Sequence, residues 1–480
     1  MAPAGSWESL SAAIKAGADS VYFGIESLNM RAHSATRFSI NDLKTIAGQC
    51  EKAGVKSYLT VNTIIYGEDL PLMRSICDAA KEAGISAVIA SDVAVLQYCH
   101  EIDQEIHLST QLNISNIEAL KFYAHYADVV VLARELNMEQ VAEIARQIDE
   151  QNIRGPRGEK IRIEMFCHGA LCMAVSGKCY LSLNTLGHSA NRGECMQVCR
   201  RGYTVRDRET GVELDVDNKY IMSPKDLKTI RFVDTMVKAG VKIFKIEGRA
   251  RGPEYVYTTV ECYKQALNAA LAETTTDEMR DQWDERLKTV FNRGFWDGYY
   301  LGQRLGEWSA QYGSSATEKK VYVGRGIKYF SKIGVAEFLL EAASIDKGDK
   351  LLDVTFRIAQ HRAWFGGEQY CVLRSHATRL ALSHSLALHH PKIRVGHIFF
   401  VSQPKTITPV KRRERVAPCL AVEYCAEFLA IGREANVIHR ISCYFSVETI
   451  LNNLSEGRIF SPTAIEMCCP LSAWSTGFSS

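Results

Sequence analysis

The sequence lacks long hydrophobic runs and a strong excess of either charge. No stretch reaches the roughly 18 consecutive apolar residues of a membrane-spanning helix, and the N-terminal segment does not lead from a cationic start into an apolar stretch. We therefore expect a cytoplasmic protein with no membrane partner. The formal net charge is only +2, which neither indicates nor excludes a nucleic acid partner, because a local basic face is averaged away in the total.

Sequence motifs of three enzyme classes are also absent. There is no His-Glu-x-x-His zinc motif, no Gly-x-Ser-x-Gly nucleophile elbow and no set of three closely spaced cysteines typical of radical-SAM enzymes. We therefore do not expect these hydrolase types or a radical-SAM mechanism. A cysteine peptidase stays open, because Cys167 or Cys172 could pair with a histidine that is distant in the sequence.

The composition is that of an ordinary globular protein with one unusual feature. Apolar residues make up 46% and charged residues 23% of the 480 residues, enough for one large domain and one or two smaller ones. The unusual feature is the number of cysteines, which is 15. Because the cytoplasm keeps thiols reduced, clustered cysteines in such a chain indicate a metal site rather than disulfide bonds.

A short phrase with a lysine or glutamate, an alanine and a glycine recurs at the ends of amphipathic stretches. Its four copies occupy residues 15–18, 52–55, 82–85 and 238–241. The glycine suits the left-handed residue that ends a helix, and apolar strand-like runs alternate with these helical stretches. The predicted strands are Val21–Ile25, Tyr58–Val61, Ala87–Ala90, Ile106–Leu108, Val129–Ala133, Ile161–Phe166 and Ile243–Ile246.

Continuous apolar strands that alternate with helices predict a parallel sheet covered on both faces. The number of units favours an α/β fold with a (β/α)8 TIM-barrel-like N-terminal domain over a doubly wound sheet. We assign this domain to residues 1–275, a helical connector to 276–318 and the start of a small β-rich C-terminal domain to 319–352. Residues 353–480 are an atypical tail without an assignment. Residues 1–5 read as the end of a first strand whose beginning is missing.

Four cysteines lie close together in a glycine-rich loop at 167–199. Six residues separate Cys172 from Cys179, fifteen separate Cys179 from Cys195, and three separate Cys195 from Cys199. Four thiolates suit a [4Fe–4S] cluster, whose irons prefer sulfur. Structural zinc is the rival, although it usually takes its cysteines as two short pairs. Unligated thiols that pack in a core are the third interpretation.

This loop follows the predicted strand Ile161–Phe166, at the face where barrel enzymes place their chemistry. Other polar residues are expected at the same rim: Asn62, Thr63, Asp92, Ser109, Thr110, Gln111, Arg134, Glu135, Lys245, Glu247 and Arg249. Together they predict a mixed-charge mouth for an anionic small molecule or a nucleotide, although loop polar groups and rim ion pairs would look the same. Cys167 is a fifth thiol nearby, either a spare or an alternative ligand.

The segment 164–182, which contains the first two of the four cysteines, closely resembles the signature of the peptidase U32 family. That family is named for collagenase-like proteases. Shorter segments resemble it too: 2–6, 18–24, 223–227 and 245–249. The resemblance covers residues 1–352, and beyond them the small β-domain of the family is no longer recognisable. The long signature with its two cysteines is specific, whereas the glycine phrases alone would not be.

Better understood bacterial members of that family resemble hydroxylation proteins, which act without oxygen on tRNA wobble uridine, on ribosomal RNA cytidine or in ubiquinone synthesis. The resemblance implies a [4Fe–4S] cluster on the four cysteines of the loop: Cys172, Cys179, Cys195 and Cys199. It also implies prephenate as a co-substrate, a carboxylate that the mixed-charge mouth would suit. Within the matching segments we predict four catalytic residues: Glu164, Lys245, Glu247 and Arg249.

The favoured function is therefore the oxygen-independent hydroxylation of a tRNA wobble uridine, with tRNA as the partner. Basic residues that could contact phosphates lie near the site, although a solvated face would have the same composition. They are Arg192, Arg200, Arg201, Arg206, Lys225, Lys228 and Arg249. A U32 peptidase and a non-catalytic scaffold stabilised by its cluster are the alternatives. The sequence names neither the electron donor nor the oligomeric state.

Overall fold

The computed structural model describes most of the first 342 residues and several strands beyond them. The described residues are 1–25, 27–30, 38–211, 213–214, 222–303, 305–330, 335–342, 350–355, 369–370, 385–389 and 397–404. The sequence also predicts a turn at Gly348 and Asp349, and this turn and most of the unassigned segment 353–480 lie outside the described residues.

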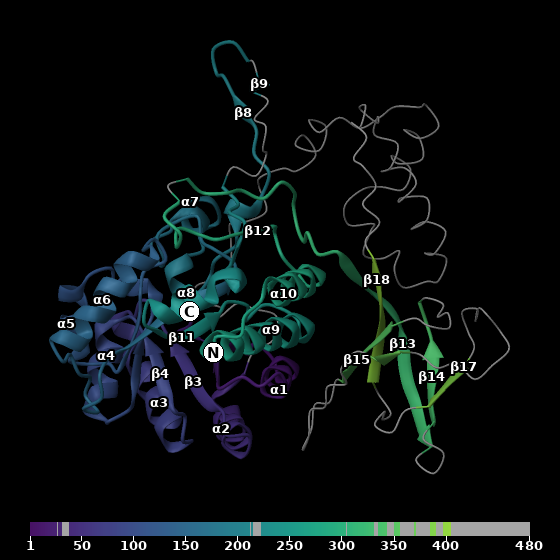
Figure 1. Cartoon of the computed structure of the whole chain (residues 1–480), viewed down its shortest axis with the longest axis horizontal. Helices are drawn as coiled ribbons and strands as arrows, with labels where there is room; N and C mark the ends of the chain where they lie inside the picture. The colour runs from purple at the N-terminus through teal and green to yellow at the C-terminus, as the bar shows by residue number, and fades with distance from the viewer. Residues whose placement is uncertain are drawn as a thin grey trace, which may run out of the picture. The chain divides into compact units, whose positions relative to one another are not determined.

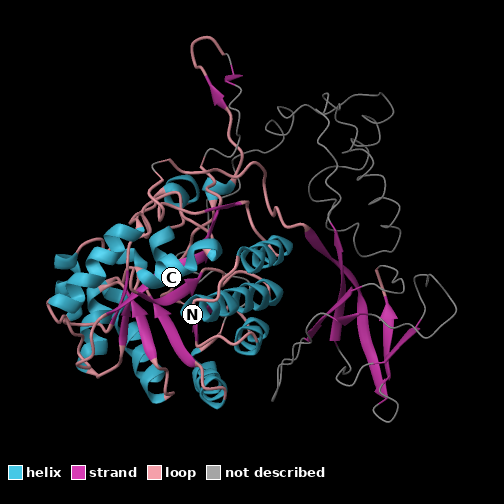
Figure 2. Cartoon of the chain, viewed as in Figure 1, coloured by secondary structure: helices cyan, strands magenta, loops and turns pink. Residues whose placement is uncertain are grey.

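Figures 1 and 2 show the sheet of the first domain inside a layer of helices, and eight of the ten described strands in this sheet form its parallel barrel part. They are β1 (Ala2–Pro3), β2 (Ser20–Phe23), β3 (Lys56–Val61), β4 (Ala87–Ala90), β5 (Ile106–Leu108), β6 (Val129–Val131), β7 (Arg162–Gly169) and β11 (Val241–Ile246). Each pairs in parallel with the next, and β11 pairs with β7. The N–H of Ile246 donates to the carbonyl of Met1 at 3.1 Å, which joins β11 to the start of β1. The TIM-barrel-like prediction is confirmed.

Helices follow the strands and cover the outside of the barrel. They are α1 (Trp7–Lys15), α2 (Leu43–Lys52), α3 (Leu70–Glu82), α4 (Val93–Glu101), α5 (Ile117–Ala124), α6 (Met138–Glu150), α8 (Val233–Lys238) and α9 (Pro253–Leu271), with short 3₁₀ turns η1 (Ile40–Asp42), η2 (Gly67–Asp69) and η3 (Thr110–Leu112) in the loops. The repeated glycines, such as Gly17 and Gly240, follow α1, α2, α3 and α8 with φ between 68° and 89°. Only glycine takes this conformation without steric cost, so the repeated phrase marks the helix ends as predicted.

The connection from β7 to β11 departs from this regular alternation. It contains α7 (Leu181–Leu186), η4 (Ala190–Arg192), η5 (Val198–Arg200), the paired strands β8 (Val205–Arg206) and β9 (Glu213–Leu214), then β10 (Asp226–Lys228) and η6 (Ile230–Phe232). Strand β10 pairs antiparallel with the end of β7, where Leu227 lies opposite Gly169. The segment predicted as a connector holds α10 (Asp277–Thr289) and β12 (Phe295–Trp296), and β12 pairs with β10. This segment therefore contributes to the barrel sheet.

A second sheet is antiparallel and six-stranded, in the order β16-β15-β18-β13-β14-β17. Its strands are β13 (Glu318–Phe330), β14 (Val335–Leu340), β15 (Lys350–Thr355), β16 (Gln369–Tyr370), β17 (Ser385–His389) and β18 (His397–Pro404). The sequence also predicts strands at 321–324 and 335–340, and these residues are part of β13 and β14. The sheet also takes strands from beyond residue 352, where the sequence pattern no longer indicated a β-domain. The domain boundaries as a whole stay a prediction.

The barrel strands bury side chains on both faces, which is why they read as continuous apolar runs. Successive residues point to opposite faces: Val21 and Leu59 belong to the large core, which includes the helices, whereas Tyr22, Tyr58 and Ile89 belong to a second, smaller cluster. Lys245, one of the predicted site residues, lies among these tyrosines, with its ammonium group 4.8 Å from the ring centroid of Tyr22. Among the described helices, none combines the length and apolar character needed to cross a membrane.

Gly5, in the loop between β1 and α1, lies against the chain at the end of β11. A Cβ on Gly5 would be 1.7 Å from the main-chain carbonyl oxygen of Arg249, and backbone cannot yield as a flexible side chain would. We expect Gly5→Ala to lower the free energy of unfolding by about 1–3 kcal/mol, as overpacking does, measured by urea denaturation. Gly48→Ala is the matched control: Gly48 lies within α2 with nothing within 4 Å, so this variant should gain up to about 1 kcal/mol. Equal urea midpoints for the two variants would contradict the packing argument.

Candidate functional site

The cysteine loop leaves the barrel at the end of β7 and folds through tight turns. Gly187 and Gly193 have φ of 72° and 85°, so both end a helical turn in the left-handed conformation. Gln197 adopts the same conformation, with φ of 51°, just before η5. The N–H of Met196 donates to the hydroxyl of buried Ser182 at 3.0 Å, which draws the second half of the loop onto α7. These turns and this hydrogen bond bring the half of the loop with Cys195 and Cys199 toward the half with Cys179.

Two arginines within the loop fasten it to the barrel rim. Arg192 donates to Asp69 at 3.1 Å, and these hydrogen bonds hold the pKa of Asp69 below its ordinary value. Arg200 donates to the carbonyl of Pro224 at 2.7 Å and also to the carbonyl of Leu171. Both side chains were predicted as phosphate contacts, and the structure uses them to position the loop.

The four cysteines of the loop are free thiols that share one region. Cys172 is exposed, and Cys179, Cys195 and Cys199 are half-buried. Burial raises the pKa of Cys199, and the other three thiols act on it in the same direction, so all four sulfurs lie within electrostatic range. Within the described part of the chain, no three histidine, cysteine or carboxylate side chains are grouped so that they could hold a metal ion. The [4Fe–4S] cluster on these cysteines stays a prediction.

Cys167 packs in the core instead. Its side chain is fully buried on β7, and burial raises the pKa of its thiol to about 12. The carbonyl of Cys167 accepts hydrogen bonds from the N–H of Thr229 at 3.1 Å and from the hydroxyl of Tyr263 at 2.7 Å. The neighbouring His168 is buried too, and burial lowers its pKa to about 3. This environment is that of an inert core thiol rather than of a reactive one.

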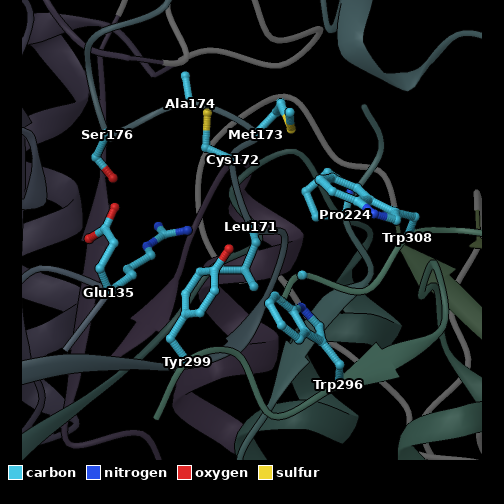
Figure 3. A pocket seen from close by; sticks show the side chains of 12 residues that line it. Glu135, Leu171, Cys172, Met173, Ala174, Ser176, Pro224, Trp296, Tyr299 and Trp308 are labelled. Carbon is cyan, nitrogen blue, oxygen red and sulfur yellow. The ribbon is translucent and has the colours of Figure 1, made fainter. Parts of the chain in front are cut away.

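A pocket opens beside Cys172 (Figure 3). Four parts of the chain line this Cys172 pocket: the loop after β6, the cysteine loop, the residue Pro224 just before β10, and the segment after α10. In Figure 3, Glu135 and Ser176 lie on one side of the pocket and Trp308 lies on the opposite side. The lining residues are Arg134, Glu135, Leu171, Cys172, Met173, Ala174, Ser176, Pro224, Trp296, Tyr299, Gly306 and Trp308.

Three aromatic side chains of the Cys172 pocket come from the segment after α10. The rings of Trp296 and Tyr299 are 5.2 Å apart in an edge-to-face arrangement, and the indole N–H of Trp296 donates to the carbonyl of Lys225 at 3.2 Å. A backbone bridge pairs Trp308 with Pro224. The sequence showed the aromatic and glycine-rich composition of this segment, but nothing indicated that β12, which has only two residues, would return it to the barrel. These aromatic residues were therefore missed.

Arg134 and Glu135, both predicted at the rim, supply the polar side of the Cys172 pocket. The guanidinium of Arg134 lies 3.9 Å from the ring centroid of Phe166 and donates to the carbonyl of Ala170 at 3.1 Å. Its Nε is buried and has no hydrogen-bond partner among the described residues. The side chain of Glu135 is exposed to the pocket. The pocket thus offers one cationic donor and one carboxylate acceptor.

The other predicted rim residues make contacts within the chain. Asn62 donates to the hydroxyl of Ser109 at 3.0 Å and to the side-chain oxygen of Gln111 at 3.1 Å. Asp92 is the N-cap of α4 and accepts from the N–H of Ala94 at 2.9 Å. These residues hold neighbouring strand ends together, as loop polar groups do. The two remaining rim residues are buried: Thr63 and Thr110.

The four residues predicted as catalytic do not line the Cys172 pocket. Glu164 and Lys245 are buried inside the barrel with their charged groups 2.7 Å apart, and burial lowers the pKa of Lys245. Arg249 is also buried and donates to the hydroxyl of Thr60 at 2.7 Å. Glu247 is half-buried at the end of β11. Their catalytic role stays a prediction, and the structure gives Glu164, Lys245 and Arg249 contacts that stabilise the barrel interior.

The remaining basic residues predicted near phosphates are mostly engaged elsewhere. The contacts are Lys225 with Glu307 at 2.6 Å, Lys228 with Asp284 at 2.7 Å, and Arg206 with the carbonyl of Gly211 at 3.3 Å. Arg201 differs, because it is exposed and lines a second cavity, next to Cys195.

The buried pair of Glu164 and Lys245 gives a test of how much the barrel interior depends on charge balance. Lys245→Met would leave the carboxylate of Glu164 buried without its partner, so we expect a loss of about 3–5 kcal/mol in the free energy of unfolding, measured with urea. The double variant Glu164→Leu with Lys245→Met removes both charges and should recover most of that loss. A double variant as unstable as Lys245→Met would show that the charge imbalance is not the cause.

Known proteins resemble this chain over the barrel and the cysteine loop. It is 66% identical over 352 residues to a Porphyromonas gingivalis protein named "Collagenase", a match that covers 73% of this chain and 85% of that protein. It is 33% identical over 309 residues to the "tRNA hydroxylation protein P1" of Bacillus subtilis, covering 63% and 70%. It is 35% identical over 306 residues to the "23S rRNA 5-hydroxycytidine C2501 synthase" of Escherichia coli, covering 62% and 44%.

The family model of peptidase family U32 matches residues 5–310. That range contains strands β2 to β12, all four cysteines of the loop and every residue that lines the Cys172 pocket. The match therefore includes the site and not only the barrel framework. The expected family is confirmed: the chain belongs to peptidase family U32.

Proposed function

We propose that this protein hydroxylates a uridine of tRNA, at the wobble position, without using molecular oxygen. The observation that carries the proposal is the composition of the Cys172 pocket. Aromatic side chains from 296–308 form one part of its wall, and Arg134 and Glu135 form another. Flat aromatic surfaces with a few polar groups are what enzymes use to hold a nucleobase that has been taken out of its stack.

The names of two relatives support an RNA base as the substrate. One is named for tRNA hydroxylation and the other for the synthesis of 5-hydroxycytidine in 23S rRNA. Both names describe a hydroxylation, one of tRNA and the other of ribosomal RNA. The choice of tRNA and of uridine for this chain follows the resemblance of its signature segment at 164–182.

The polar side of the Cys172 pocket suits the edge of uracil. Uracil presents two carbonyl oxygens, which accept hydrogen bonds, on either side of one N–H group, which donates. Arg134 can only donate, and the carboxylate of Glu135 accepts when ionised. Trp308 and Tyr299 are both half-buried, so each leaves part of its ring surface available for stacking. These four residues would therefore bind and orient the base.

The four cysteines would hold a [4Fe–4S] cluster beside this base. In such a cluster each iron takes its own thiolate, and the loop supplies four free thiols. When bound, the cluster would supply electron transfer. Arg192 and Arg200 keep the loop against the barrel, so their contribution is to fix Cys172 beside the pocket.

Replacing a hydrogen on the base by a hydroxyl group removes two electrons from the base and needs a donor of the oxygen atom. We keep prephenate, which the resemblance implies, as the co-substrate in the proposal. As a carboxylate it would need a cationic partner, and Arg134 is the cation that lines the Cys172 pocket. Water would supply the oxygen atom with release of two protons, and the two electrons would leave one at a time through the cluster to an external one-electron acceptor.

A peptidase is the second candidate, because the relative at 66% identity is named "Collagenase". The contacts of the described residues favour it less. No histidine lines the Cys172 pocket, and the thiol of Cys167 is buried with its pKa raised to about 12, whereas a cysteine nucleophile needs a lowered pKa. A peptidase would therefore have to use a different arrangement of groups.

The cluster is tested by the metal content of two cysteine variants. Protein purified without oxygen should contain about four irons with acid-labile sulfide per chain, and Cys172→Ala should lose most of both. Cys167→Ala is the matched control, because this nearby thiol lies in the core, and it should keep its iron. Wild-type protein that carries zinc in place of iron and sulfide would overturn the cluster assignment. Equal iron loss in both variants would make Cys167 a candidate ligand.

The substrate is tested by comparing modified nucleosides in tRNA from a strain that lacks the gene with those of its parent. We expect 5-hydroxyuridine-type nucleosides to disappear and to return with the wild-type gene. Trp308→Ala should lower hydroxylation by about tenfold, because stacking on an aromatic ring contributes about 1–3 kcal/mol per base. Phe122→Ala is the control, since Phe122 is exposed on the outer helix α5.

An unchanged nucleoside profile in the deletion strain would reject the tRNA substrate. Cleavage of gelatin by the purified protein, lost in Cys172→Ala, would then support the peptidase instead.

A further inference from the structure

A second cavity opens beside Cys195, and its charge is strongly positive. Its walls come mainly from the cysteine loop, from the turn after β11 and from the segment after α10, and Met30 and Ser223 complete them. None of the described residues that line it is acidic. Four arginines line what we call the arginine cavity: Arg200, Arg201, Arg251 and Arg293.

Within this group, one carboxylate is hydrogen-bonded to the arginines. The side chain of Asp226 accepts from the backbone N–H of Arg293 at 3.2 Å, and its other oxygen lies 3.4 Å from the guanidinium of Arg293. Asp226 is buried, and Arg251 and Arg200 also act on it. Among the described residues, the two carboxylates that act on the arginines, Asp226 and Glu247, are fewer than the four guanidinium groups, so an excess of positive charge remains there. Grouped like charges are unfavourable unless an anion accompanies them.

The guanidinium group of Arg251 stacks on a ring instead of donating hydrogen bonds to the described residues. Its guanidinium lies 3.5 Å from the ring centroid of Phe291 and donates no hydrogen bond to any residue in the described part of the chain. Stacking of this kind fixes the plane of a guanidinium and leaves its N–H groups at the edge, where they can bind two oxygens of a phosphate. Phe291 therefore orients Arg251, and none of the described residues accepts a hydrogen bond from its guanidinium.

The arginines are not all needed to compensate the thiolates of the loop. Arg200 is the one on which Cys172 and Cys199 act, and its side chain is already bonded to backbone carbonyls. Arg251 responds to Arg293, Glu247 and Asp226 rather than to any cysteine. The charge of Arg251 is thus offset in part by two carboxylates and not by the loop thiols.

The arginine cavity and the Cys172 pocket are neighbours. Ser223 lines the cavity, and Pro224, the next residue, lines the pocket. Tyr312, which is 72% exposed, also lines the cavity and presents a ring on which a base can stack. A chain of nucleotides can therefore place a base in the pocket while a neighbouring phosphate lies in the cavity.

We infer that the arginine cavity binds a phosphate of the RNA strand whose base enters the Cys172 pocket, with Arg251 and Arg201 as the main contacts. This inference rests on the proposed function and adds the means by which the strand is positioned. A phosphate of a continuous strand is favoured over a free anion because the exposed ring of Tyr312 lines the cavity and the cavity shares the Ser223–Pro224 segment with the aromatic pocket.

The test measures the binding of a fluorescent ten-nucleotide oligouridylate to the full-length protein at several salt concentrations. Arg251→Gln and Arg201→Gln should each weaken binding about tenfold, the loss expected for one charge-assisted contact. Each should also reduce the slope of log K against log salt by about 0.7. Lys44→Gln is the matched control, because it removes the same charge from the exposed face of α2, and it should bind like the wild type.

Arg201→Gln guards against misfolding as an explanation, since Arg201 is exposed, and Arg251→Lys should recover part of the binding. The inference is overturned if both arginine variants bind the oligonucleotide as the wild type does. It is also overturned if they lose affinity only for inorganic phosphate or malonate and not for the oligonucleotide, because the cavity would then be a site for small free anions. The assay needs no turnover, so normal binding with unchanged tRNA nucleosides would reject the proposed hydroxylation and leave the phosphate site standing.

Discussion

Strand β7 is the element on which the site depends, because it pairs with three neighbours. Strands β6 and β11 flank it in the barrel, and its last residues, His168 and Gly169, pair with Leu227 and Lys228 of β10. This last pairing brings together the two ends of the long excursion that carries the cysteines. Closing a long loop costs entropy, and the backbone bonds of β10 together with the contacts of Arg192 offset part of that cost. The positions of the four loop cysteines follow from where this excursion begins and ends.

The same pairing explains why two cavities of different character lie next to each other. Strand β10 is held by β7 on one side and by β12 on the other, and the residues just before β10 separate the cavities. Ser223 faces the arginines, and Pro224 faces the tryptophans. A recognition surface for a flexible, charged chain needs both kinds of contact, apolar surface for its bases and cations for its backbone. The fold places them one residue apart.

The parts of the fold that sequence predicts well are those with local causes. Strands such as Ala87–Ala90 and Ile106–Leu108 lie where expected, because strands buried on both faces leave continuous apolar runs. The glycines at helix ends were predicted for an equally local reason, because the left-handed conformation there depends on the helix end itself. Strand β10 was missed because it has three residues, two of them charged, and it gains its place only from its partners.

The site was predictable to a smaller extent, for the same reason. The cysteines share a short segment and stood out, whereas Arg251 and Arg293 belong to different elements and meet only through the fold. Asp92 looked like a site residue because a helix cap and a catalytic carboxylate have the same position after a barrel strand. One contiguous stretch, 291–313, supplies the tryptophans of the pocket and Arg293 and Tyr312 of the cavity. Because β12 lies within this stretch and pairs with β10, the sheet that positions the cysteine loop also positions the aromatic walls of both cavities, so a change in this pairing would move both together.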